Sequence, residues 1–95
     1  LRQIIKKHIK IFGDVQGVGF RYWLQAFAIR KGIFGWVRNT SGGQVEALLV
    51  GNDETVLNLI EQCHMGPPTS KVNHISVEDY AGNYQTKSFD IFPSS

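Results

Sequence analysis

Apolar and polar positions alternate near the start of the chain and then change to a helical period. Residues 7–12 place Ile9 and Ile11 on one face, which is the pattern of a half-buried strand. Over residues 21–31 the apolar positions recur at helical spacing, and Gly32 behind them suits a left-handed helix C-cap. The apolar stripe of this predicted helix consists of Phe20, Trp23, Leu24, Phe27 and Ala28.

The next part of the chain predicts a hairpin and a second helix. Residues 34–38 and 44–50 read as two short strands around a turn at residues 39–43. We expect the second helix to begin after Asn52 as its N-cap and to stop at Gly66, which two prolines follow. Its predicted buried stripe is Val56, Leu57 and Ile60, with Cys63 near the end.

Two further strands, at about residues 72–80 and 88–92, complete the pattern. The order β-α-β-β-α-β with a short extra C-terminal strand predicts an α+β, ferredoxin-like sandwich, with two helices on one face of an antiparallel sheet. In this topology the first two strands run in the same direction with the third between them. Their C-terminal ends therefore lie at one edge, about 10 Å apart, and Asn39 comes beside the turn that follows the first strand.

That turn, residues 13–19, has the features of an anion site. It contains no proline, and Gly17 and Gly19 allow positive φ and close approach of a ligand. Loop N–H groups that lead into a helix N-terminus favour a phosphate. Arg21 faces the positive end of the helix dipole at a cost of about 0.3–1 kcal/mol, which a bound anion would reverse. An ordinary turn with a solvated arginine is the alternative, and spacing alone favours neither.

Length, net charge and cysteine content limit the domain number, the partners and the location that we expect for this chain. The 95 residues predict one domain, 1–95, with residues 1–6 as an N-terminal extension. A net charge of +2 gives no reason to expect a nucleic acid or membrane partner. The single cysteine, Cys63, excludes an internal disulfide and favours a reducing, cytoplasmic location. We expect no metal site, because His64 points away from Cys63 on a helix and no second Cys/His pair is present.

Two motifs at a matching separation are similar to those of a known family. The stretch from Val15 to Arg21, VQGVGFR, and the stretch GWVRNT from Gly35, followed by GQVE from Gly43, resemble the acylphosphatase family over about residues 7–92. The resemblance implies hydrolysis of small acyl phosphates without metal or other cofactor. Arg21 and Asn39 correspond to the family's two catalytic positions. The implied phosphate-binding residues are Val15, Gln16, Gly17, Val18, Gly19, Phe20 and Arg21.

The resemblance also implies a division of labour. The loop amides and Arg21 hold the phosphoryl oxygens, and Asn39 positions a water for in-line attack. The residues suit such a substrate, because the motifs hold no general acid and a carboxylate with a pKa near 4 leaves without one. We expect inorganic phosphate or sulfate to compete, and we expect a monomer. Read alone, Asn39 before two glycines is ordinary turn chemistry.

Three other interpretations remain open. RNA-recognition domains share the order of elements, but their aromatic motif belongs on the third strand and residues 31–38 lie on the second. An anion sensor without turnover would need Arg21, whereas the presence of Asn39 as well favours catalysis. The same signature occurs in hydrogenase-maturation proteins, where proline typically follows the arginine. Tyr22 stands there in this chain, which favours a free-standing enzyme.

Overall fold

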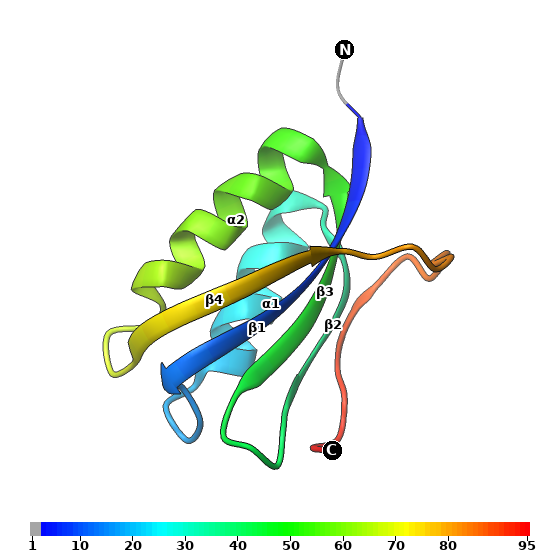
Figure 1. The fold of residues 1–95 in the computed structure, drawn as a ribbon. Coiled ribbons are helices and arrows are strands. Elements are labelled where there is room, and N and C mark those ends of the chain that lie inside the picture. The colour runs from blue at the N-terminus through cyan, green and yellow to red at the C-terminus, as the bar shows by residue number, and fades with distance from the viewer. Residues whose placement is uncertain (1–2) are drawn as a thin grey trace.

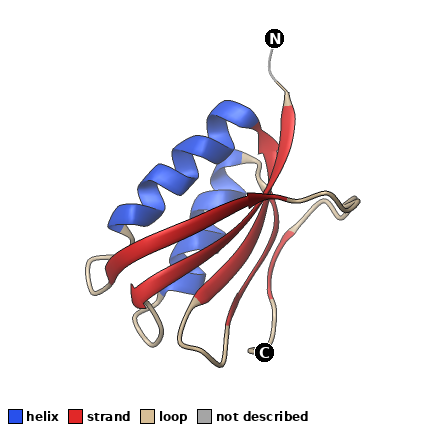
Figure 2. Ribbon diagram, in the orientation of Figure 1, coloured by secondary structure: helices blue, strands red, loops and turns tan. Residues whose placement is uncertain are grey.

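A computed structural model describes residues 3–95 and shows a sheet with two helices packed on one of its faces (Figures 1 and 2). Part of the extension predicted at residues 1–6 lies outside the described residues, and residues 4–6 belong to the first strand. The elements in chain order are β1 (Ile4–Asp14), α1 (Phe20–Lys31), β2 (Phe34–Asn39), β3 (Val45–Asn52), α2 (Asp53–Met65), β4 (Lys71–Asp79) and β5 (Phe89–Ile91).

The sheet has the strand order β4-β1-β3-β2-β5, which confirms the predicted ferredoxin-like topology. β3 lies between β1 and β2 and is antiparallel to both, so β1 and β2 run in the same direction. The predicted antiparallel pairing holds among β1, β2, β3 and β4, whereas β5, the short extra strand, pairs with β2 in parallel at one edge. The chain leaves β4 at one edge and crosses to the other before β5, and it therefore enters β5 in the direction of β2 (Figure 1).

The core lies between the helices and the sheet face that they cover. The predicted faces of the first and third strands are confirmed, since Ile9, Ile11, Val45, Ala47 and Leu49 are fully buried. From α1, the buried side chains are Phe20, Leu24 and Ala28, with Trp23 and Phe27 packed against the core from its margin.

The predicted stripe of α2 was wrong at one residue. Leu57 is 51% exposed, and Leu59 is buried in its place. Successive helical residues are about 100° apart, so a stripe that contains Val56 continues three, four and seven residues later. The buried residues of α2 follow this spacing and are Val56, Leu59, Ile60 and Cys63.

Three caps of the helices lie at the residues that the sequence predicts. Gly32 is the C-cap of α1 with φ 70°, and Gly66 is the C-cap of α2. Asn52 is the N-cap of α2 as expected, but its side chain makes no capping hydrogen bond. The N–H of Glu54 donates instead to the Asp53 side chain at 2.7 Å. None of the helices in the described part of the chain is long and apolar enough to cross a membrane.

Candidate active site

β1 and β2 end at the same end of the sheet, so that the loop at residues 15–19 and the turn at residues 40–44 are neighbours (Figure 1). Val45 at the start of β3 pairs with Ile11 on one side and with Asn39 on the other. Asn39 is the last residue of β2 rather than a turn residue. The topology thus brings Asn39 to the same edge as the glycine loop, as predicted.

The loop between β1 and α1, residues 15–19, presents backbone N–H groups. Gly17 and Gly19 have φ values of 73° and 80°, in the left-handed region that other residues adopt only with strain. Within residues 3–95, the N–H groups of residues 16–20 donate no backbone hydrogen bond. On the carbonyl side, Thr69 Oγ1 donates to the Val18 oxygen at 3.1 Å. The loop is therefore held through the carbonyl of Val18, and its backbone N–H groups stay available to bind a ligand.

Arg21 is the second residue of α1 and is half-buried. With residues 3–95 its guanidinium forms no ion pair and no hydrogen bond. The first turn of α1 contains no acidic residue, and Gly19 as N-cap offers no side-chain acceptor. An unpaired cation, unpaired amides and the positive end of a helix dipole thus lie together, which is an arrangement that attracts an anion.

Asn39 contains a buried acceptor without a partner. Its Oδ1 is buried, yet it accepts no hydrogen bond from residues 3–95. Its backbone is held, because the carbonyl accepts from the Ser95 N–H at 3.1 Å. Leaving a buried acceptor unsatisfied costs about 1–3 kcal/mol, so such an atom usually has a water or a ligand beside it. Asn39 lies two positions after Val37 and on the same, helix-covered face.

Gln16 connects the loop to the turn, a contact that we did not predict. Its Nε2 donates to the carbonyl oxygens of Thr40 and Gln44, both at 2.8 Å. The N–H of Thr40 also donates to the Gln44 oxygen, at 2.9 Å, which closes the turn on itself. The bonded residues are 24 and 28 positions from Gln16, and no local pattern indicates a contact over such distances.

The opposite face of the sheet carries a cluster of paired charged side chains. Arg38 Nε donates to Glu46 Oε1, and His8 Nε2 lies against Glu46 Oε2, each at 2.6 Å. The guanidinium of Arg38 also lies over the Trp36 ring, 5.1 Å from its centre. Burial alone would raise the pKa of Glu46, but the hydrogen bonds from Arg38 and His8 outweigh it and lower that pKa.

Other reactive groups lie outside this edge. Cys63 is buried in the core as predicted, and burial raises the pKa of its thiol to about 12. His64 beside it is exposed. Within the described residues, no three His, Cys, Asp or Glu side chains gather as a metal site would require.

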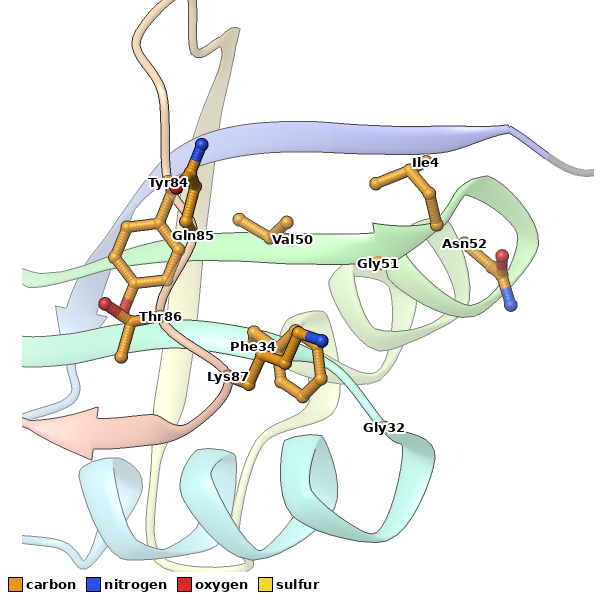
Figure 3. Close-up of a pocket in the computed structure, with 10 residues that line it drawn as sticks. All are labelled: Ile4, Gly32, Phe34, Val50, Gly51, Asn52, Tyr84, Gln85, Thr86 and Lys87. Carbon is orange, nitrogen blue, oxygen red and sulfur yellow. The ribbon is translucent and has the colours of Figure 1, made fainter.

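A cavity of about 530 Å³ lies at the other end of the sheet, between the start of β1, the end of β3 and the segment before β5 (Figure 3). Its floor is apolar, with Ile4, Phe34 and Val50, and the ring of Tyr84 stands at one side. None of the predicted site residues lines it. The remaining lining residues are Gly32, Gly51, Asn52, Gln85, Thr86 and Lys87.

Known proteins are similar to this chain in sequence and in fold. The family model described as Acylphosphatase matches residues 7–91. An acylphosphatase of Nitrobacter winogradskyi is 46% identical over 79 residues, covering 83% of this chain and 80% of the relative. One of Pyrobaculum aerophilum is 41% identical over 95 residues, covering 97% and 98%. The crystal structure of acylphosphatase from Bacillus subtilis matches with a TM-score of 0.88 and 36% identity, covering 95% and 99%. The chain therefore belongs to the acylphosphatase family of enzymes.

Proposed function

We propose that this acylphosphatase cleaves the carboxyl–phosphate bond by in-line attack of water, without a metal ion. The amides of residues 15–20 and the Arg21 guanidinium hold the phosphoryl oxygens. Asn39 Oδ1 accepts a hydrogen bond from the attacking water and so orients its lone pair toward phosphorus. The water oxygen forms the new bond to phosphorus, the bond to the acyl oxygen breaks, and the carboxylate leaves with the electron pair. A phosphoryl oxygen of the substrate takes the water proton.

One observation carries the proposal, namely that Asn39 Oδ1 and the N–H groups of the loop, at the same edge of the sheet, have no partner within residues 3–95. A transition state of phosphoryl transfer places charge on its equatorial oxygens and needs the nucleophile held in line. Donors fixed by the loop meet the first need, and a fixed acceptor for water meets the second. A set of donors and an acceptor at one edge, without partners among the described residues, support both roles.

The choice of substrate follows from the leaving group. No candidate general acid lies among the residues assigned to the site, so an alkoxide would have to leave unprotonated. A carboxylate has a pKa near 4 and leaves without a proton. We therefore expect acyl phosphates to be hydrolysed and simple alkyl phosphates to be poor substrates.

The test is hydrolysis of benzoyl phosphate in the presence of EDTA, with glycerol phosphate as the matched poor substrate. We expect full activity on benzoyl phosphate with the chelator present and little activity on the alkyl ester. Activity that EDTA abolishes and zinc or magnesium restores would contradict the metal-free mechanism. Equal rates on both substrates would reveal a general acid elsewhere.

Arg21 supplies the formal charge for anion binding in this mechanism. Phosphate or sulfate should inhibit competitively and should raise the melting temperature, because a ligand bound only by the folded state stabilises it. Arg21→Ala should lose both effects, and Arg21→Lys should recover them poorly because an ammonium cannot form a bidentate fork. Arg30→Ala is the control on the same helix, since Arg30 lies at the far end over the Phe27 ring. Unchanged inhibition in Arg21→Ala would move the anion site elsewhere.

We further propose that the enzyme acts as a monomer on a small-molecule substrate, with no nucleic acid partner. Sedimentation at two protein concentrations tests the first statement, and it predicts one mass at both. A salt-titrated binding assay with single-stranded RNA tests the second. Binding that weakens steeply with salt would favour the alternative of an RNA-binding module.

A further inference from the structure

The two parts of the proposed site belong to separate pieces of chain that must keep a fixed spacing. The phosphate-binding loop follows β1, Asn39 ends β2, and β3 lies between these strands. Within the described residues, the hydrogen bonds that cross from this loop to the turn after Asn39 both come from the side chain of Gln16. Both hydrogens of its amide are used in this way.

The acceptors of those bonds are the two ends of the turn. Gln16 Nε2 reaches the carbonyl oxygen of Thr40, which directly follows Asn39, and that of Gln44, which directly precedes β3. Thr40 and Gln44 are bonded to each other through the Thr40 N–H and again through the Thr40 hydroxyl. The turn is therefore one closed unit, and holding both of its ends fixes Asn39 relative to the loop.

We propose that the side chain of Gln16 is a positioning residue for catalysis. Its backbone N–H belongs to the phosphate-binding loop, whereas its side-chain amide points to the turn and does not contact the phosphate. The amide sets the distance between the bound phosphate and the water on Asn39. This inference rests on the proposed function, and it adds a residue that acts through Asn39 rather than on the substrate.

Gln16→Met tests the inference, because methionine keeps the length of the side chain and removes both donors. A misplacement of about 1 Å in such a site can cost up to 10² in rate. We expect kcat for benzoyl phosphate to fall about tenfold, with KM and the inhibition constant of phosphate within about twofold of the native values. A fall in phosphate affinity that matches the fall in kcat would overturn the proposal and assign Gln16 to phosphate binding.

Gln25→Met is the matched control for a merely structural loss. Gln25 Nε2 donates to the Phe89 carbonyl at 2.9 Å and joins α1 to β5, away from the turn. Its loss should lower the melting temperature at least as much as Gln16→Met and leave kcat unchanged. If both variants lost kcat in proportion to melting temperature, Gln16 would have only a structural role.

A double-mutant cycle with Asn39→Ala decides whether Gln16 acts through Asn39. Residues that act on one step through a shared group give non-additive effects. In the Asn39→Ala background we expect Gln16→Met to change kcat less than twofold. The same tenfold loss in both backgrounds would overturn this inference while leaving the proposed mechanism intact. Normal kcat in Asn39→Ala itself would instead remove the proposed mechanism, so the two failures are distinguishable.

Discussion

Arg38 and Asn39 are neighbours in sequence, yet they stand on opposite faces of β2 and in opposite electrostatic conditions. Arg38 is paired with Glu46 at 2.6 Å and lies over Trp36, so its charge has a partner. Asn39 Oδ1 is buried without a partner among the described residues. Successive residues of a strand face opposite sides, so one step along β2, from Arg38 to Asn39, passes from paired charges to a buried acceptor without a partner among the described residues.

The same contrast holds between Arg38 and Arg21. Arg38 faces a carboxylate, whereas Arg21 forms no ion pair within residues 3–95 and stands at the positive end of α1. Where partners are complete, the polar groups stabilise the fold. Where they are missing on both a cation and a buried amide, the fold carries an unfavourable arrangement that a bound anion and water would relieve.

We expect the largest effect from a substitution of Asn39, the residue whose buried acceptor has no partner within residues 3–95. Asn39→Ala should lower kcat by roughly 10²–10³, because one preorganised polar group at a transition state contributes about 2.7–4 kcal/mol. Phosphate inhibition should remain nearly intact, since in the proposed mechanism Asn39 orients the water and not the phosphate. The melting temperature should stay unchanged or rise, because the substitution removes a buried acceptor that has no partner in the part of the chain that the structure describes.

Steady-state kinetics with benzoyl phosphate and thermal unfolding of the same preparation provide the measurement. Arg38→Met is the neighbouring control, and it should lower the melting temperature with little effect on kcat. Turnover lost only in proportion to unfolded protein would return Asn39 to the role of a strand-end residue.

Most of the fold could be predicted because apolar residues recur with a clear period in most of its strands and helices. The alternation that places Ile9 and Ile11 in the core, and the stripe that ends at Gly32, are local patterns that tertiary contacts reinforce. Leu57 was misplaced because four of the five residues at 56–60 are apolar, and only the helical spacing separates the buried ones from Leu57. The pairing of β5 could not be predicted from the sequence. The strand has only three residues after an irregular segment, which is too short to show a periodic pattern of apolar residues.

The part of the candidate site that the strand topology brings together could be predicted from the sequence. Arg21 and Asn39 follow from the motifs, and the ferredoxin-like order brings their elements to one edge. The bonds from Gln16 to the turn and the pairing of His8 with Glu46 depend on strand register and side-chain reach. Such contacts join residues far apart in the sequence, and spacing in one chain does not specify them.

We expect a smaller effect, on stability, from a substitution in the paired cluster of Arg38, Glu46 and His8. Glu46→Gln should lower the free energy of unfolding by about 1–3 kcal/mol, because Arg38 and His8 lose a charged acceptor. The loss stays at this level because the Arg38 and His8 side chains are 33% and 25% exposed and can be rehydrated. Urea unfolding measures it, with Glu61→Gln on the exposed side of α2 as a control within about 0.5 kcal/mol. A kcat reduced more than a few-fold in Glu46→Gln would mean that the cluster also supports the site.

The smallest effect is the pH dependence of that same pairing. Arg38 and His8 hold the pKa of Glu46 below its ordinary value of 4.5, despite the burial that opposes this shift. The unfolded state therefore binds the proton more readily than the folded state, and the stabilisation from Glu46 is fully present above about pH 4.5. It is lost as the pH falls below that value and through the lowered pKa. The difference in melting temperature between the native protein and Glu46→Gln should be largest near pH 6 and should shrink toward pH 3. Because other carboxyl groups titrate equally in both proteins, the difference isolates Glu46, and a constant difference over this range would show that its charge contributes nothing.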